Sequence, residues 1–237
     1  MNTKPDVTVI LPCYNEDAVF TGSLRDIIQT LSLSRFSFEI IFVDDGSGDL
    51  TRERIKRVCR ADKRCRYVFH PQNLGRGAAV SSGMREARAD IVGYMDIDCE
   101  VSPLYIPSFV QILKEGRADI VVGRRVYRTT FSSIIREILS VGYQKITSTF
   151  LGTDGVDTES GYKFFNKKAF LPVCSEIRNN GWFWDTESII LSLKKGLSVR
   201  EEPVLFLRRF DKQSSVRLIP DTLLYLKNVW ELYWRFH

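Results

Sequence analysis

The sequence has few cysteines, and their pattern excludes the usual cysteine-based frameworks. Five cysteines are scattered along 237 residues, none forms a Cys-x-x-Cys pair, and their number is odd. Disulfide scaffolds and zinc sites depend on paired, closely spaced cysteines. We therefore expect reduced thiols, which fit a cytosolic protein.

Long apolar runs are also missing. No window approaches 18 uninterrupted apolar residues, and no basic stretch followed by an apolar core opens the chain. We expect neither a signal peptide nor a transmembrane helix, so any contact with a membrane is expected at its surface, by a cytoplasmic protein. The net charge of +5 favours an anionic partner only weakly, and nucleic acid is not predicted as a partner.

Several catalytic signatures are absent. The sequence has two histidines, His70 and His237, and nothing near His70 completes a Ser/His/Asp or metal-ligand set, so His70 is expected to be structural. There is no Gly-x-Ser-x-Gly elbow, which disfavours acyl-enzyme hydrolysis. No P-loop and no Gly-x-Gly-x-x-Gly fingerprint occurs either, and neither repeats nor a domain linker are visible.

The sequence does contain a regular alternation of strands and helices. Apolar runs predict strands at residues 7–11, 38–43, 66–70 and 119–123, a strand from Ile91 into an acidic motif, and one or two strands at 197–207 broken by Pro203. Helical spacing predicts helices at residues 17–33, 51–60, 77–88, 103–115 and 131–150, and another ending near Gly196. This order predicts an α/β fold with a mostly parallel sheet flanked by helices. We expect one domain over residues 1–218, followed by an amphipathic helix over 219–237.

The acidic motif is the centre of the functional prediction. The strand from Ile91 runs into the carboxylates of Asp96, Asp98 and Glu100. Residues i and i+2 of a strand share a face, so Asp96 and Asp98 can together meet a hard cation that carries substrate phosphates. Mg²⁺ or Mn²⁺ is the expected ion. The alternative is a pair of solvated loop acids, which are common in turns.

Other polar residues follow neighbouring strands. Asp45 ends the second strand, where it either hydrogen-bonds a base or ribose or belongs to an Asp-Gly turn. The run Asn73-Leu74-Gly75-Arg76-Gly77 opens a helix and either binds phosphate through backbone N–H groups or forms a tight turn. Ligands of such sheets collect at the carboxyl ends of the strands, where all these residues are expected.

Four segments together resemble the inverting glycosyltransferases of family two. They are Leu11-Pro12-Cys13-Tyr14-Asn15-Glu16, Val43-Asp44-Asp45-Gly46-Ser47, the run from Asn73 to Gly77, and Asp96-Ile97-Asp98. Gly123-Arg124-Arg125 and the segment from Asp157 to Phe165 are similar to patterns of the polyprenyl-phosphate glycosyltransferases, the dolichyl-phosphate mannose and glucose synthases. Cys99-Glu100 departs from the mannose synthases' usual Leu-Gln, whereas the segment from Phe183 to Glu187 looks more like the glucose synthases.

The resemblance implies a GT-A fold, a nucleotide-sugar donor, a divalent cation and a polyprenyl or dolichyl phosphate acceptor at the cytosolic face of a membrane. It assigns the donor pocket to a set of strand-end residues: Pro12, Tyr14, Glu16, Val43, Asp45, Asn73, Arg76, Asp96 and Ile97. It places Asp96, Asp98 and Glu100 around the cation, with Asp98 also counted as catalytic. Arg124, Arg125, Arg136 and Arg209 are the candidates that neutralise the acceptor phosphate, since guanidinium binds phosphate bidentately.

Two alternatives remain open. If the acceptor is a sugar hydroxyl of a polysaccharide or glycolipid, Asp185 is the expected catalytic base, because that proton must be removed in the transition state. A non-catalytic nucleotide-sugar-binding scaffold at the membrane is the alternative of another class.

The last helix is the expected membrane contact. Pro220 opens it at a favoured first-turn position, and Leu, Val, Trp, Tyr and Phe leave only a narrow polar stripe. Trp and Tyr suit the headgroup layer of a membrane, while docking on the domain core is the alternative.

Overall fold

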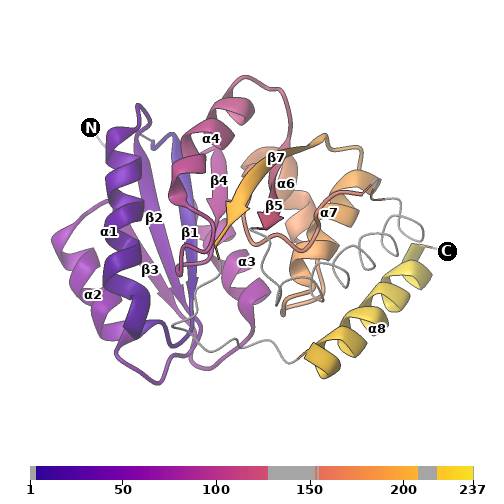
Figure 1. The fold of residues 1–237 in the computed structure, drawn as a ribbon, viewed down its shortest axis with the longest axis horizontal. Helices are drawn as coiled ribbons and strands as arrows, with labels where there is room; N and C mark the ends of the chain where they lie inside the picture. Colours follow the sequence, from indigo (N-terminus) through magenta and orange to yellow (C-terminus); the bar gives the residue numbers. More distant parts are fainter. Residues whose placement is uncertain (1–3, 128–152, 154, 208–217, 237) are drawn as a thin grey trace.

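The computed structural model describes residues 4–127, 153, 155–207 and 218–236 (Figure 1). The strands are β1 (Val7–Cys13), β2 (Phe38–Asp44), β3 (Cys65–Phe69), β4 (Ile91–Tyr94), β5 (Ile120–Tyr127), β6 (Lys163–Asn166) and β7 (Val199–Phe206). The helices are α1 (Asp17–Leu33), α2 (Thr51–Ala61), α3 (Arg76–Glu86), η1 (Pro103–Tyr105), α4 (Ile106–Lys114), α6 (Lys167–Cys174), α7 (Trp184–Lys194) and α8 (Leu218–Phe236).

The strands form one sheet in the order β3-β2-β1-β4-β6-β5-β7. Only β6 runs antiparallel to its neighbours, β4 and β5, and the other described strands are parallel. The predicted α/β fold with a mostly parallel sheet is therefore confirmed.

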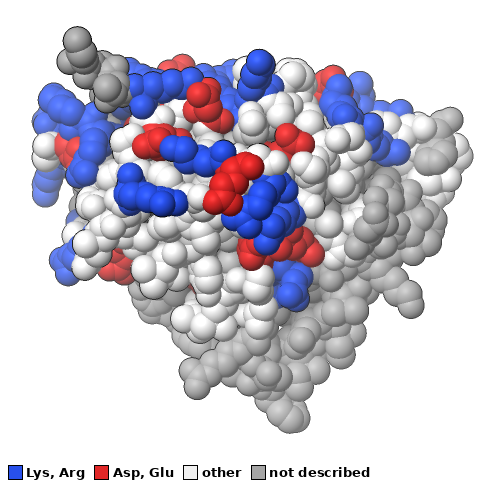
Figure 2. Space-filling view, turned by 90° about the horizontal axis from the view of Figure 1, so that it is seen from above, with Lys and Arg blue, Asp and Glu red and all other residues white. Residues whose placement is uncertain are grey.

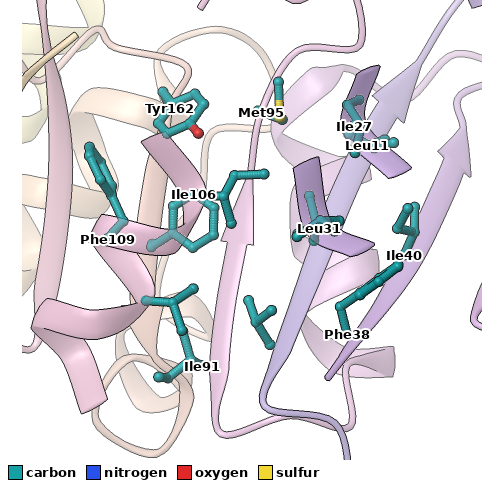
Figure 3. Close-up of a cluster of buried hydrophobic side chains, with 14 of the residues drawn as sticks. Leu11, Ile27, Leu31, Phe38, Ile40, Ile91, Met95, Ile106, Phe109 and Tyr162 are labelled. Atoms are coloured by element: carbon teal, nitrogen blue, oxygen red, sulfur yellow. The ribbon is translucent and has the colours of Figure 1, made fainter. Parts of the chain in front are cut away.

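Helices cover both faces of this sheet (Figure 1). Alternate residues of β1 point to opposite faces, so Leu11 belongs to the buried cluster that includes residues of α1, α2 and α4, and Ile10 to the cluster that includes residues of α3, α6 and α7. Figure 3 shows the first of these two cores, in which Ile27 and Leu31 of α1 lie over Leu11 and Ile40, and Ile106 of α4 lies beside Phe109. The double cover explains why the central strands read as continuous apolar runs.

Some boundaries differ from the sequence-based prediction. The strand at Val199–Phe206 is not broken at Pro203. Pro has no backbone N–H to donate to a neighbouring strand, and it is tolerated here because β7 is the last strand in the sheet order. Helix α6 was not predicted at all, although Asn166 caps it by accepting a hydrogen bond from the Ala169 N–H at 3.3 Å. The helix predicted at residues 131–150 lies outside the described residues.

The C-terminal helix α8 docks on the domain through one side. Its Val229 and Leu232 are buried against Phe183 and Ile190 of the α7 region. Arg235 of α8 forms an ion pair with the buried Glu187, with 2.9 Å between Nη1 and Oε1. The helix still presents apolar side chains outward, so core docking and a free apolar face occur together.

Charged side chains of both signs are mixed on the described part of the face seen in Figure 2. Such a mixture neutralises much of the local field. This face therefore does not alter the expectation that nucleic acid is not a partner.

Candidate active site

The carboxyl ends of β1, β2 and β4 lie side by side, because these strands are parallel and paired in register. The loop after β1 is tied to the loop after β2 by side-chain bonds: Ser47 Oγ accepts from Asn15 N at 3.0 Å, and Thr51 Oγ1 accepts from Glu16 N at 2.8 Å. Tyr14, which precedes Asn15 in the loop after β1, is half exposed. Pro12, Tyr14 and Glu16 thus lie at the predicted edge, and their contact with a donor stays a prediction.

Asp45 organises the neighbouring loop from inside. Its buried carboxylate accepts hydrogen bonds from the backbone N–H groups of Leu74 and Gly75, both at 2.9 Å, and lies 2.7 Å from His70 Nδ1. His70 Nε2 lies 3.0 Å from Ser82 Oγ on α3, so the imidazole links β2 to α3. The expectation that nothing completes a Ser/His/Asp set around His70 is therefore wrong, because Asp45 and Ser82 lie at its two ring nitrogens. Asp45 is placed beside the predicted nucleoside pocket, with much of its hydrogen-bonding capacity already used.

Gly75 allows α3 to begin where it does. Its φ of +103° is accessible to glycine, and a Cβ atom there would lie 2.3 Å from the carbonyl oxygen of Asn180. The same carbonyl accepts a hydrogen bond from Ala78 N at 3.1 Å. The start of α3 is therefore packed directly against the loop before α7. Val43 is buried in β2, and Asn73 is exposed in the loop before Gly75.

Arg76 connects the acidic motif to α7. Its Nε and Nη2 lie 2.8 and 2.7 Å from Asp96 Oδ1, and its Nη1 lies 2.7 Å from Asp185 Oδ2. The guanidinium also stacks near the rings of Tyr94 and Trp182, with its carbon 5.3 and 5.2 Å from their centroids. The Arg76 side chain is 9% exposed, Asp185 3% and Asp96 43%. Arg76 therefore spans from the core to the edge of the site.

Asp185 lies deep in this group and accepts bonds on both oxygens. The Tyr94 hydroxyl donates to Oδ1, Arg76 donates to Oδ2, and Lys163 Nζ lies 3.7 Å from Oδ1. Burial raises the pKa of Tyr94 well above its usual range, and the Asp185 carboxylate adds to the shift, so Tyr94 remains a proton donor. The predicted role of Asp185 as a base for a hydroxyl acceptor stays a prediction.

Lys163 is a fully buried cation on β6. Its Nζ donates to the carbonyl oxygens of Thr158, at 3.0 Å, and Ser160. Burial lowers its pKa to about 8, although the carboxylates of Asp185 and Asp157 act in the opposite direction.

Burial also lowers the pKa of Arg76, but the carboxylates of Asp185 and Asp96 raise it by more, so the net shift of the Arg76 pKa is upward. The Arg76 cluster, defined here as Arg76, Tyr94, Asp96, Lys163 and Asp185, thus holds two cations against two carboxylates.

Asp96, Asp98 and Glu100 lie in the turn that follows β4, which ends at Tyr94, so the prediction that Asp96 and Asp98 share the face of a strand is wrong. Asp98 is partly buried and accepts a hydrogen bond from Glu100 N at 3.3 Å, while Ile97 between the two aspartates is buried in the core. Loss of hydration raises the pKa of Asp96, Arg76 lowers it, and Asp98 raises it further, with a net upward shift. A cation placed at this pair would relieve the repulsion between the two carboxylates.

The residues fit Mg²⁺ or Mn²⁺ only as a site shared with phosphates. Among the residues that the structure describes, no three His, Cys, Asp or Glu side chains are grouped closely enough to hold a metal ion alone. Mg²⁺ is commonly bound by one or two carboxylates and completed by substrate phosphates and water. Asp96 and Asp98 match that pattern, and the assignment of Asp96, Asp98 and Glu100 as ligands stays a prediction.

Arg125 on β5 already has carboxylate partners. Its Nε and Nη2 donate to Asp157 at 2.9 and 2.8 Å, and Nη2 also donates to Glu159 at 3.2 Å. Burial raises the pKa of Asp157, but Arg125 reverses the shift and holds that pKa below its usual value. The neighbouring Arg124 is exposed. Arg136 and Arg209, the other predicted phosphate-binding arginines, lie outside the described residues, so their roles and that of Arg125 stay predictions.

Sequence reasoning missed several members of the site. In the sequence, Tyr94 is an ordinary strand residue, Trp182 is part of a loop, and Lys163 is one position in the segment from Asp157 to Phe165. In the structure, all three contact Arg76 or Asp185. Gly161 was also missed: a Cβ atom there would lie 2.5 Å from Asp96 Oδ2 and 2.6 Å from Arg76 Nη2. The only available signal was charge in an apolar strand, since Lys163 directly precedes Phe164 and Phe165.

Comparison with known families decides the class of this fold. The family model described as glycosyl transferase family 2 matches residues 8–172, from within β1 to within α6. The chain belongs to glycosyl transferase family 2. The predicted family is therefore confirmed, and the predicted glycosyltransferase class agrees with it.

The family-2 chain is similar to several curated glycosyltransferases. It is 30% identical over 234 residues to glycosyltransferase AglD of Haloferax volcanii, covering 97% of this chain and 37% of that protein. It is 28% identical over 219 residues to the dolichyl-phosphate beta-glucosyltransferase of Saccharomyces cerevisiae, covering 84% of this chain and 66% of the yeast protein. The chain thus spans between about a third and two thirds of the length of these relatives.

Solved structures share the fold of the family-2 chain. The glucosyl-3-phosphoglycerate synthase of Mycobacterium tuberculosis, in complex with Mn²⁺, uridine diphosphate and glucosyl-3-phosphoglycerate, superposes with a TM-score of 0.68 at 21% identity, covering 95% of this chain and 77% of that one. A mannosyltransferase of Pyrobaculum calidifontis in complex with GDP-mannose and Mn²⁺ gives a TM-score of 0.59 at 16% identity, over 86% and 57% of the two chains. The predicted GT-A fold is confirmed. Within the described residues, no helix is both long and apolar enough to cross a membrane.

Proposed function

We propose that this family-2 domain transfers a hexose, with inversion, from a nucleotide sugar to a polyprenyl or dolichyl phosphate at the cytosolic face of a membrane. The observation that carries the proposal is the Asp96–Asp98 pair at the carboxyl end of β4, braced by Arg76. The names of the dolichyl-phosphate beta-glucosyltransferase relatives support a lipid phosphate acceptor and favour glucose over mannose.

Asp96 and Asp98, with Glu100 beside them, would hold Mg²⁺ or Mn²⁺. The ion would supply charge stabilisation for the departing nucleoside diphosphate. The nucleoside pocket would be lined by Pro12, Tyr14, Glu16, Asp45 and Asn73, because all of them lie along the carboxyl ends of β1 to β3. The solved structures of this fold that contain Mn²⁺ with a nucleotide or nucleotide sugar support such a pairing.

The acceptor chemistry favours phosphate over a hydroxyl. A phosphate monoester has its second pKa near about 6, so it is largely a dianion at pH 7 and needs no strong base. Asp185 is buried and both its oxygens accept bonds from core groups, which is poorly suited to receiving a substrate proton. Arg124 and Arg125 remain the described candidates for reducing repulsion between acceptor and donor phosphates.

The outward face of α8 is the proposed membrane contact. Its Leu223, Trp230 and Trp234 are 62, 59 and 58% exposed, whereas its Val229 and Leu232 pack on the domain. Trp at a helix surface suits the headgroup layer, where a polyprenyl phosphate presents its charge. The helix would lie in the interface rather than span the bilayer.

One experiment tests donor and acceptor together. The protein is incubated with Mn²⁺ or Mg²⁺, a short polyprenyl phosphate and, in separate reactions, UDP-glucose or GDP-mannose, and the lipid is analysed by mass spectrometry. The expected product is the polyprenyl phosphate carrying one glucose, formed from UDP-glucose. Transfer to a glycolipid or polysaccharide hydroxyl, with none to the lipid phosphate, would overturn the proposal.

A further inference from the structure

The contacts of Asp96 are one-sided. Within the described part of the chain, Arg76 reaches Asp96 through Nε and Nη2, and both nitrogens lie close to the same oxygen, Oδ1. The other oxygen, Oδ2, lies next to Gly161, where a Cβ atom would come within 2.5 Å of it. Arg76 therefore fixes how the Asp96 carboxylate is turned, and the absence of a side chain at Gly161 allows Oδ2 to keep this position.

Arg76 is itself held by Asp185. The Asp185 carboxylate is 3% exposed and accepts hydrogen bonds from Arg76 Nη1 and the Tyr94 hydroxyl. The rings of Tyr94 and Trp182 restrict the guanidinium further. Arg76 Nη2 is buried and, within the same residues, has no acceptor in hydrogen-bond geometry, although it lies 2.7 Å from Asp96 Oδ1. The positive charge of Arg76 therefore lies next to Asp96, although Nη2 makes no hydrogen bond with it.

We propose that Arg76 and Asp185 are positioning residues that set the orientation and the effective charge of Asp96 for a divalent cation. Arg76 occupies Oδ1, so Asp96 offers Oδ2 to the ion. The positive charge of Arg76 weakens cation binding at Asp96, and the negative charge of Asp185 limits that weakening. This inference rests on the proposed function for the presence of the cation, and it gives Asp185 a role other than that of a base.

The two residues should act on cation binding with opposite signs. Arg76→Met removes a positive charge beside Asp96, so the protein should bind Mn²⁺ at least about threefold more tightly. Asp185→Asn keeps the shape but leaves Arg76 uncompensated, so Mn²⁺ should bind at least about threefold more weakly. The double variant should return to within about twofold of the wild type, because the two charge changes oppose each other.

The measurement is the dissociation constant of Mn²⁺ in the presence of UDP, which supplies phosphate ligands to the shared site, from calorimetric titration of the folded full-length protein after subtraction of the same titration of UDP without protein. Arg76→Lys keeps the charge but loses the contact of two nitrogens with Oδ1, so it should bind Mn²⁺ more weakly than the wild type, which separates the orientation of Asp96 from its effective charge. Arg66→Met and Glu39→Gln are matched controls. They alter another arginine–carboxylate pair, 3.3 Å apart, whose buried carboxylate is at the amino end of β2, and they should leave the Mn²⁺ dissociation constant unchanged.

If Arg76→Met does not fold, comparison of Asp185→Asn with the double variant gives the same information, because removing Arg76 from the Asp185→Asn protein should tighten Mn²⁺ binding. Weaker binding in both single variants, unchanged binding in both, or no Mn²⁺ binding by the wild type at millimolar concentration would overturn the inference. Sugar transfer is measured separately, so loss of the proposed activity with the predicted Mn²⁺ pattern intact would reject only the proposed function.

Discussion

At the scale of single residues, Asp98 gives the simplest test of the predicted metal site. It is partly buried in the turn after β4 rather than in the core, so Asp98→Ala should leave the fold intact while lowering turnover by several orders of magnitude. Steady-state kinetics with Mn²⁺ checks the rate, and circular dichroism checks the fold. Full activity of the wild type in excess chelator would contradict a role for the metal.

Arg125 tests the acceptor side. Because it already bridges Asp157 and Glu159, its charge would reach a lipid phosphate only as part of that network. Arg125→Ala should raise the acceptor KM or lower kcat at least about tenfold while changing donor affinity little. Arg124→Ala is the neighbouring comparison, with an exposed side chain. Calorimetry that shows donor binding lost, with acceptor kinetics unchanged, would assign Arg125 to the donor instead.

Lys163 makes a prediction for stability against pH. Its pKa is about 8 in the folded protein and near 10.5 when exposed. Between these values the unfolded chain binds more protons on Lys163 than the folded protein does, so this residue makes stability rise with pH in that window. Below about pH 8 both states are protonated and the burial cost is complete.

The test compares the wild type with Lys163→Met by urea unfolding at pH 7 to 10. The free energy of unfolding of the wild type, relative to the variant, should be constant near pH 7 and increase above pH 8. A constant difference through pH 10 would show that Lys163 keeps its ordinary pKa in the folded protein.

At the scale of elements, α8 has two apolar faces with different expected roles. Replacing Trp230 and Trp234 with Gln removes exposed rings without touching the docked Val229 and Leu232. The double variant should bind anionic vesicles at least about tenfold more weakly, because each ring would bury apolar area in the interface. Co-sedimentation measures this, and Glu231→Gln on the same helix is the control. Equal sedimentation of the folded double variant would show that this face does not bind membrane.

The elements also show what sequence patterns can and cannot predict. Parallel strands bury both faces, so β1, β2 and β4 read as apolar runs, and the acidic residues that follow them could be assigned to one edge. The brace between Arg76 and Asp185 could not be predicted, because the two residues are 109 positions apart and meet only when α7 packs beside α3. The contact of Arg235 on α8 with Glu187 could not be predicted either, because periodicity identifies an apolar face of a helix but not the residues against which that helix packs.

At the scale of the whole molecule, donor binding should appear as stability. A ligand that binds only the folded state stabilises it by about 2.7 kcal/mol at a hundred times its dissociation constant, which for a domain of this size corresponds to roughly 5–10 °C in Tm. We expect UDP with Mn²⁺ to give this shift and GDP with Mn²⁺ to give less, because the curated relatives named after dolichyl phosphate are glucosyltransferases.

Differential scanning fluorimetry with each nucleotide, with and without Mn²⁺, measures the effect. The shift should require both components, because Asp96 and Asp98 leave coordination positions that only phosphates and water can fill. Asp96→Asn should abolish the dependence on Mn²⁺, whereas Asp90→Asn, an exposed carboxylate paired with Lys4 before β4, should retain it. A larger shift with GDP would assign the donor to the mannose type, and equal shifts without metal would show that the nucleotide binds independently of the Asp96–Asp98 pair.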